Sequence, residues 1–107
     1  HDMARALLTA GQPDDVIALL KNKVKPDVSD PRLYEILGRA YAMKGNQAQY
    51  HAAMAESYAR RGNYHDAVTQ MEMAQRNTGG TFYDQSINDA RLREFRARFK
   101  NMLSASQ

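Results

Sequence analysis

Apolar residues recur along this chain at the three- and four-residue spacing that marks one side of an α-helix, and short polar corners separate the runs. The pattern predicts about six helices, at approximately residues 3–10, 13–24, 31–44, 47–61, 64–77 and 82–102. The expected fold class is therefore all-α, an array of helical hairpins. The last and longest helix is expected to pack on the open end of the array as a cap.

Three corners in the chain combine a glycine with an amide residue: Gly11-Gln12, Gly45-Asn46 and Gly62-Asn63. The first two corners are 34 residues apart and the last two are 17 apart. A period of 34 residues is that of a tetratricopeptide helix-turn-helix unit, and half of it is one helix plus one turn. The spacing predicts a right-handed α-solenoid in which residues 47–61 serve two hairpins, as second helix of one and first helix of the next.

Two of the predicted helix starts carry capping signals. Asp30 can accept a hydrogen bond from the free amides of the next helix, and Pro31 suits its first position. Thr81 followed by Asp84 can cap the last helix in the same way. These signals set the expected starts of the third and sixth helices.

The third predicted helix matches the first-helix pattern of a tetratricopeptide repeat residue by residue, at Tyr34, Leu37, Gly38, Tyr41 and Gly45. A glycine inside a helix costs about 1 kcal/mol relative to alanine. We interpret Gly38 as a point where the partner helix approaches so closely that a side chain would clash.

A narrower resemblance covers nearly the whole chain. The residues that carry it are Ala10 to Pro13, Gly45-Asn46 with Gln49, Ala52 to Glu56, Asp84 to Leu92, and Arg98 to Lys100. In these residues the chain resembles the C-terminal segment of bacterial periplasmic zinc metalloproteases that end in tetratricopeptide repeats. The run Asp89 to Leu92 is the most characteristic part of this resemblance.

The resemblance implies a protein-protein interaction module that binds substrates and partners in the quality control of outer-membrane protein assembly. Its implied partners are outer-membrane beta-barrel precursors, their assembly machinery and its own protease domain, and its implied compartment is the periplasm. In that family the zinc is held by a His-Glu-x-x-His motif in a preceding domain, and this motif is absent from the sequence. The chain is thus expected to be non-catalytic and without a cofactor of its own. The alternative is a stand-alone tetratricopeptide scaffold or chaperone adaptor.

Stacked hairpins bind polypeptides on their concave face. Matching the chain to the repeat pattern gives the predicted partner-binding residues as Arg5, Thr9, Arg32, Glu35, Arg39, Met43, Gln49, Glu56 and Arg60. A second docking candidate is the basic tail, represented by Arg91, Arg93 and Arg98. For the tail, a solvated face that complements the helix dipole is favoured over a polyanion site.

Composition and residue chemistry narrow the remaining choices. The 107 residues carry a formal net charge of +3 and no cysteine, which leaves no disulfide or thiolate metal site. No histidine has a second histidine four positions away on the same helical face, so we expect no metal site and no catalytic residues. We also expect no nucleic-acid partner. No apolar run approaches the ~20 residues of a transmembrane segment.

The domain is expected to span residues 4–103. Residues 1–3 are interpreted as a cloning scar at the start of an excised fragment, because they lack the basic and apolar regions of a signal peptide. Residues 104–107 are expected to form a disordered tail.

Overall fold

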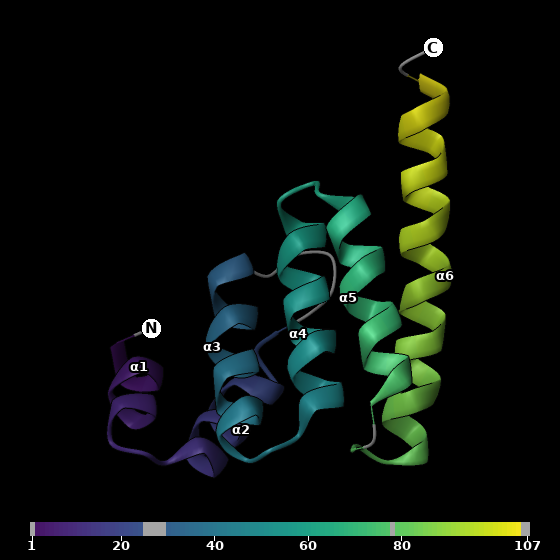
Figure 1. Cartoon of the computed structure of the whole chain (residues 1–107). Coiled ribbons are helices and arrows are strands. Elements are labelled where there is room, and N and C mark those ends of the chain that lie inside the picture. Colours follow the sequence, from purple (N-terminus) through teal and green to yellow (C-terminus); the bar gives the residue numbers. More distant parts are fainter. Residues whose placement is uncertain (1, 25–29, 78, 106–107) are drawn as a thin grey trace.

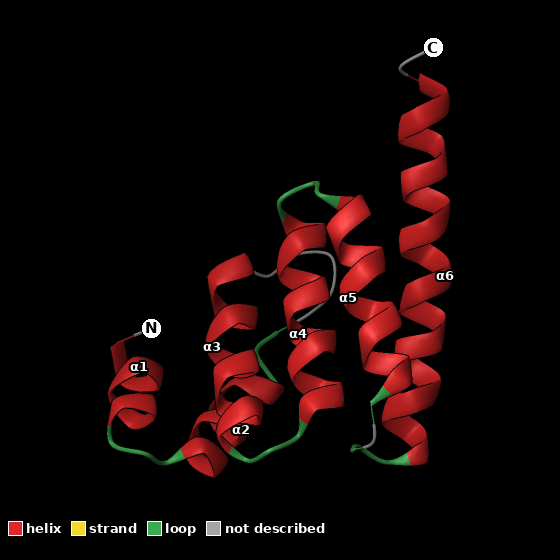
Figure 2. Cartoon of the chain, viewed as in Figure 1, coloured by secondary structure: helices red, strands yellow, loops and turns green. Residues whose placement is uncertain are grey.

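The computed structural model describes residues 2–24, 30–77 and 79–105, and these residues form an all-helical array (Figures 1 and 2). The helices are α1 (Asp2–Thr9), α2 (Pro13–Lys21), α3 (Pro31–Met43), α4 (Gln47–Arg60), α5 (Tyr64–Arg76) and α6 (Phe82–Ala105). Within the described residues there are six helices and no strand, which confirms the predicted all-α, tetratricopeptide-like class.

Helices α3 to α6 lie side by side in chain order, and α6 extends well beyond the end of α5 (Figure 1). The most extensive contacts of α4 are with α3 on one side and α5 on the other. One apolar cluster fills the space between α1, α2 and α3, around Val16 and Leu20. A second joins α4, α5 and α6, around Ala55, Met71 and Phe95, all of which are fully buried. The predicted sharing of residues 47–61 between two hairpins agrees with this packing.

The turns between helices lie at the glycine-amide corners that the sequence predicts. Gly11, Gly45 and Gly62 all have φ between +72° and +79°, a left-handed conformation that favours glycine. After two of them, an asparagine side chain caps the next helix: the Asn46 Oδ1 accepts from the Gln49 amide and the Asn63 Oδ1 from the Asp66 amide, both at 3.1 Å. At each such corner, three residues separate the end of one helix from the start of the next.

The close approach expected at Gly38 is milder than a clash. A Cβ atom built on Gly38 would lie 3.4 Å from the Ala53 Cβ and 3.5 Å from the Met54 sulfur, which is ordinary van der Waals contact. Alanine therefore fits at this position, and only a larger side chain would push α3 and α4 apart. The interpretation that any side chain would clash is wrong.

Two predicted helix ends differ from the structure by three residues, and the other four differ by one. α2 ends at Lys21 instead of residue 24, because the chain tightens there: the Lys23 and Val24 amides both donate to the Leu20 carbonyl, at 2.9 and 3.0 Å. Val24 still packs against the first cluster, which explains why the apolar spacing runs past the helix. α6 continues to Ala105 rather than 102, since no glycine or proline interrupts it, so Ser104 and Ala105 belong to the helix and not to a tail.

Some predictions fall on residues outside the described part of the chain. These are His1, the loop 25–29, and residues 106–107 of the expected tail. Of the expected scar, Asp2 and Met3 lie in α1.

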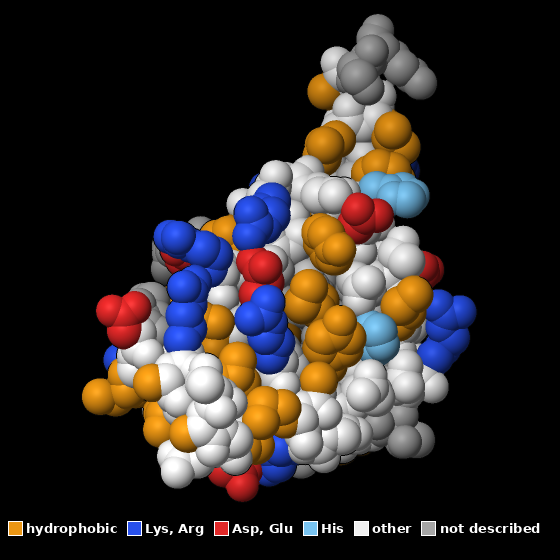
Figure 3. All heavy atoms as spheres, turned by 60° about the vertical axis from the view of Figure 1, so that its left-hand side comes forward, with side chains coloured by type: hydrophobic (Ala, Val, Ile, Leu, Met, Phe, Trp, Pro, Cys, Tyr) orange, Lys and Arg blue, Asp and Glu red, His pale blue; other side chains and the backbone are white. Residues whose placement is uncertain are grey.

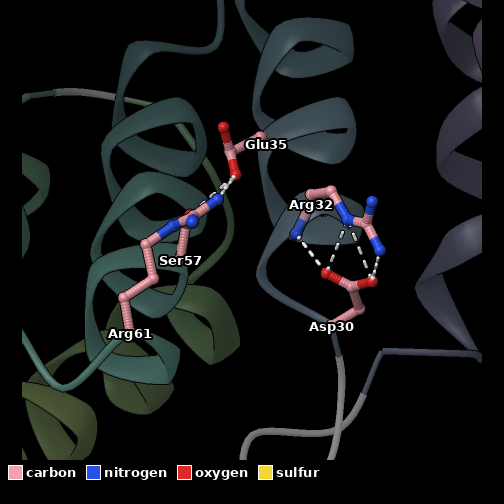
Figure 4. Close-up of polar contacts among 5 residues, drawn as sticks. All are labelled: Asp30, Arg32, Glu35, Ser57 and Arg61. Atoms are coloured by element: carbon pink, nitrogen blue, oxygen red, sulfur yellow. Dashed lines mark hydrogen bonds and ion pairs between the residues drawn. The ribbon is translucent and has the colours of Figure 1, made fainter.

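The start of α3 is capped as predicted. The Asp30 Oδ1 accepts from the Arg32 amide at 2.9 Å, and the Asp30 Oδ2 accepts from the Arg32 Nη2 at 2.8 Å (Figure 4). The reciprocal pair at α6 forms too: the Asp84 amide donates to the Thr81 hydroxyl at 3.1 Å, and the Thr81 amide donates to the Asp84 Oδ2 at 2.9 Å.

The contacts of Asp30 lead to a testable pH dependence. The hydrogen bonds from the Arg32 side chain and amide lower the pKa of the Asp30 carboxyl from 3.8 to about 2. Because this pKa is depressed in the folded state, the stabilisation from Asp30 is complete above about pH 4 and is lost as the pH falls through about 2. A carboxyl-carbon NMR titration should give the midpoint near 2, and in Arg32→Gln the midpoint should rise. A midpoint that Arg32→Gln leaves unchanged would contradict the assigned cause.

Candidate functional site

A largely apolar groove lies between α3, α4 and the first turns of α6, with the end of α2 at one edge. It encloses about 300 Å³. The lining residues are Lys21 at the end of α2 and Val24 just after it; Tyr34, Leu37 and Tyr41 of α3; Gln49, Ala52, Ala53 and Glu56 of α4; Met71 of α5; and Tyr83, Asp84, Ile87 and Asn88 of α6. We call this hollow the apolar groove.

Large hydrophobic side chains at the start of α6 form one wall of the apolar groove and remain open to solvent. Tyr83 is 72% exposed and Ile87 is 42% exposed, and the neighbouring Phe82 is 84% exposed. Exposed apolar side chains that gather at one place, next to polar ones, are typical of interaction surfaces. The wall is held in place by the Thr81–Asp84 capping pair at the base of the helix.

The opposite wall carries the hydroxyl group of Tyr41. Burial raises the pKa of this phenol above its ordinary value, and the nearby Asp84 carboxylate acts in the same direction. A hydrogen bond with the Gln49 side chain opposes this rise in pKa, and the phenol is protonated at neutral pH as an ordinary tyrosine is. It gives the groove a hydrogen-bond donor among apolar neighbours.

Polar side chains join α4 to α6 along the floor. The side-chain Nδ2 of Asn88 donates to the Gln49 Oε1 at 3.1 Å. The Arg91 guanidinium donates two hydrogen bonds to the Glu56 carboxylate, of 2.7 and 3.0 Å. These side chains are mostly withdrawn from water, with 11% of Glu56 and 18% of Arg91 exposed. The pair joins α6 to α4 at one end of the apolar groove.

No family model matches the chain. It is 30% identical over 102 residues, 92% of its length, to proteins of Escherichia coli K12, Shigella flexneri and Escherichia coli O157:H7. Each of these relatives is a beta-barrel assembly-enhancing protease. The chain resembles a segment of this protease.

The chain spans about a fifth of the length of the beta-barrel assembly-enhancing protease, 21% in each case. The resemblance predicted from the sequence is thus confirmed for a segment.

Within the described residues, no three histidine, aspartate or glutamate side chains gather in a way that could hold a metal ion. In that same part of the chain, no helix has the length and apolar content of a membrane span.

The structure divides the predicted partner-binding residues between two sides of the array. Gln49 and Glu56 line the apolar groove. Arg32, Glu35, Arg39 and Met43 recur at helical spacing on the side of α3 away from Tyr34, Leu37 and Tyr41, which line the groove. Arg60 lies beyond the end of the groove, in contact with Glu56.

The side of α3 away from the groove is charged. Glu35 accepts from the Arg61 Nη2 at 2.5 Å and from the Ser57 hydroxyl at 3.3 Å (Figure 4). Arg5 and Arg32 come together around a shallow depression between α1 and α3, and Thr9 is exposed further along α1. In the space-filling view, basic and acidic side chains lie next to one another on the side where α1 and α3 come forward, beside a strip of hydrophobic side chains (Figure 3).

The basic tail is not a single surface. Arg91 is paired with Glu56, and Arg98 donates to Glu94 at 2.9 Å, both on one side of α6. Arg93 is exposed and lies on the opposite side of the helix, since two residues along a helix turn the side chain through about 200°. The three arginines therefore cannot contact one flat partner together.

Sequence reasoning missed the wall at the start of α6. The available signal was Phe82-Tyr83, two aromatic residues at a helix start that do not share the buried stripe of Leu92 and Phe95. Of the described histidines, His51 is half-buried, with its Nδ1 2.8 Å from the Gln70 Oε1, and His65 is exposed in the first turn of α5.

Proposed function

We propose that the chain is a polypeptide-binding module of a periplasmic protease that acts in outer-membrane beta-barrel assembly, and that it binds client segments in the apolar groove. The proposed clients are unfolded beta-barrel precursors and the machinery that assembles them, and the chain's own protease domain is a further occupant to test. In this proposal the module performs no catalysis and carries no cofactor, and the zinc belongs to another part of the protease.

The single observation that carries the proposal is the exposed apolar wall of Tyr83 and Ile87 facing Tyr34 and Leu37 across the groove. Strands of a beta-barrel alternate apolar and polar side chains. A groove with apolar walls and polar groups at Asp84 and Gln49 matches such an extended segment, because its apolar side chains can pack against the walls while the others stay near water or polar groups.

The test uses a fluorescently labelled outer-membrane beta-barrel protein, unfolded in urea and diluted into buffer with the chain, with anisotropy as the readout. The double variant Tyr83→Ser with Ile87→Ser should weaken binding at least about tenfold, or about 1.4 kcal/mol, because the apolar area that both side chains bury against the client would be lost. Circular dichroism should stay unchanged, since both side chains are exposed. Met3→Ser, at a methionine that is 67% exposed on α1, is the matched control and should bind as the parent does.

Two outcomes would reject the groove. If Arg5→Glu with Arg39→Glu abolishes binding while the serine variant binds normally, the charged side of α1 and α3 is the working surface. If the unchanged chain does not bind the unfolded protein at all, the proposed client class is wrong.

A further inference from the structure

A second hollow lies beyond the Glu56–Arg91 pair, between the end of α4, the start of α5 and the middle of α6. It also encloses about 300 Å³, and most of its surface is polar. Its lining side chains include Arg60, Arg91, Glu94, Phe95 and Arg98. We call it the arginine pocket.

Arg60 is the least well paired charge of this pocket. Its side chain is only 12% exposed, and within the described residues it makes a single hydrogen bond to a carboxylate, of 3.4 Å, from the Arg60 Nη1 to the Glu56 Oε1. Glu56 is already engaged by the two shorter bonds from Arg91. A guanidinium has five N–H donors, and a charge withdrawn from water is costly unless it is paired. The rest of the Arg60 guanidinium is thus left to face the pocket.

Positive side chains dominate the lining of the pocket. The lining includes three guanidinium groups, of Arg60, Arg91 and Arg98, and one carboxylate, of Glu94. The Arg91 guanidinium also lies 4.8 Å from the centre of the Phe95 ring, which is fully buried. A hollow lined mainly by positively charged groups attracts an anion more strongly than an open surface does.

The arginine pocket continues the apolar groove along the same sides of α4 and α6. On α4 the sequence of side chains is Gln49, Glu56 and Arg60, and on α6 it is Asn88, Arg91 and Arg98. The distance from Gln49 to Arg60 along the helix is about 16 Å at 1.5 Å per residue. An extended polypeptide covers that distance in about five residues.

We propose that the arginine pocket binds a carboxylate of the polypeptide whose apolar residues occupy the groove. This inference rests on the proposed function and adds a preference for an acidic group to it. A carboxylate fits because it can accept two parallel N–H bonds from one guanidinium. The carboxylate is either an acidic side chain or the C-terminus of the bound segment, at about five residues from the apolar residues in the groove.

The experiment uses a labelled synthetic peptide with alternating apolar and polar residues and, about five residues further on, one glutamate followed by the free C-terminus. A second version carries glutamine in place of the glutamate, and a third carries a C-terminal amide. One of these two changes should weaken binding about tenfold, and which of them does so identifies the source of the carboxylate. Arg60→Gln should weaken binding of the first peptide by a similar factor and should have little effect on the weakened version.

Arg93→Gln is the matched control, because it removes the same charge from the opposite side of α6 and should leave all three affinities unchanged. If Arg60→Gln alters the melting temperature, Arg98→Gln serves in its place, since Arg98 is 55% exposed at the rim. Equal binding of all three peptides would overturn the carboxylate preference while leaving the proposed function intact. Absence of binding by every version would instead count against the groove itself. Equal losses in Arg60→Gln and Arg93→Gln would indicate general charge attraction and would also overturn the inference.

Discussion

Replacing Phe95 with alanine should lower the free energy of unfolding by about 3–5 kcal/mol, because a fully buried ring at the junction of three helices would leave a cavity. The ring lies among Ala55, Ala59 and Met71 of α4 and α5, with the Tyr64 ring centre 6.3 Å away. The loss is a large share of the about 5–15 kcal/mol that stabilises a typical domain. Urea denaturation followed by circular dichroism would measure it.

Phe82→Ala is the control for this prediction, since it removes the same side chain from the start of the same helix. Phe82 is 84% exposed, so its removal should change the free energy of unfolding by about 0.5 kcal/mol or less. Similar losses for Phe82→Ala and Phe95→Ala would mean that α6 does not pack on α4 and α5 through Phe95.

Glu56→Gln should cost about 3 kcal/mol. The substitution keeps the shape of the side chain but removes the negative charge that pairs with Arg91 and Arg60, leaving two cations with 18% and 12% of their side chains exposed. Breaking a buried pair in this way costs about 3–5 kcal/mol, and the lower end applies here because the arginines keep some contact with water. Thermal and urea denaturation of the variant would measure the loss.

Glu72→Gln is the matched control. Glu72 also pairs with an arginine of α6, at 2.9 Å from the Arg96 Nη2, but 41% of its side chain and 54% of that of Arg96 are exposed. An exposed pair contributes about 1 kcal/mol or less. If both glutamine variants lose the same small amount, Glu56 does not hold α6 against α4.

The helices and their corners could be predicted from the sequence because the signals act over a few residues. Gly45 with Asn46, and Asp30 with its following proline, each specify a local backbone conformation and its hydrogen bonds. The end of α2 could not be predicted in the same way. Val24 keeps its place in the apolar cluster although it lies outside the helix, so the spacing of apolar residues extends beyond the helical backbone.

The candidate site was harder to predict because it depends on contacts between distant residues. The alternation of Arg39 and Tyr41 on α3 identifies two sides of the helix, but it does not say which side α6 will face. The decisive contacts, such as Gln49 with Asn88 and Glu56 with Arg91, join residues 39 and 35 positions apart. Neither pair leaves a local pattern, and a helical surface with mixed charges looks the same whether or not another helix will cover it.

The place where Glu56 and Arg91 meet divides the hollow side of the array into two unlike ends. The end toward the start of α4 offers apolar walls, and the end toward its last turn offers guanidinium groups. A peptide and its reversed sequence would therefore be different ligands. For a given direction of the backbone, only one of them would place its apolar residues in the apolar groove and its carboxylate in the arginine pocket. In the proposed binding mode, the Glu56–Arg91 pair between α4 and α6 therefore makes binding depend on the direction of the bound chain as well as on its composition.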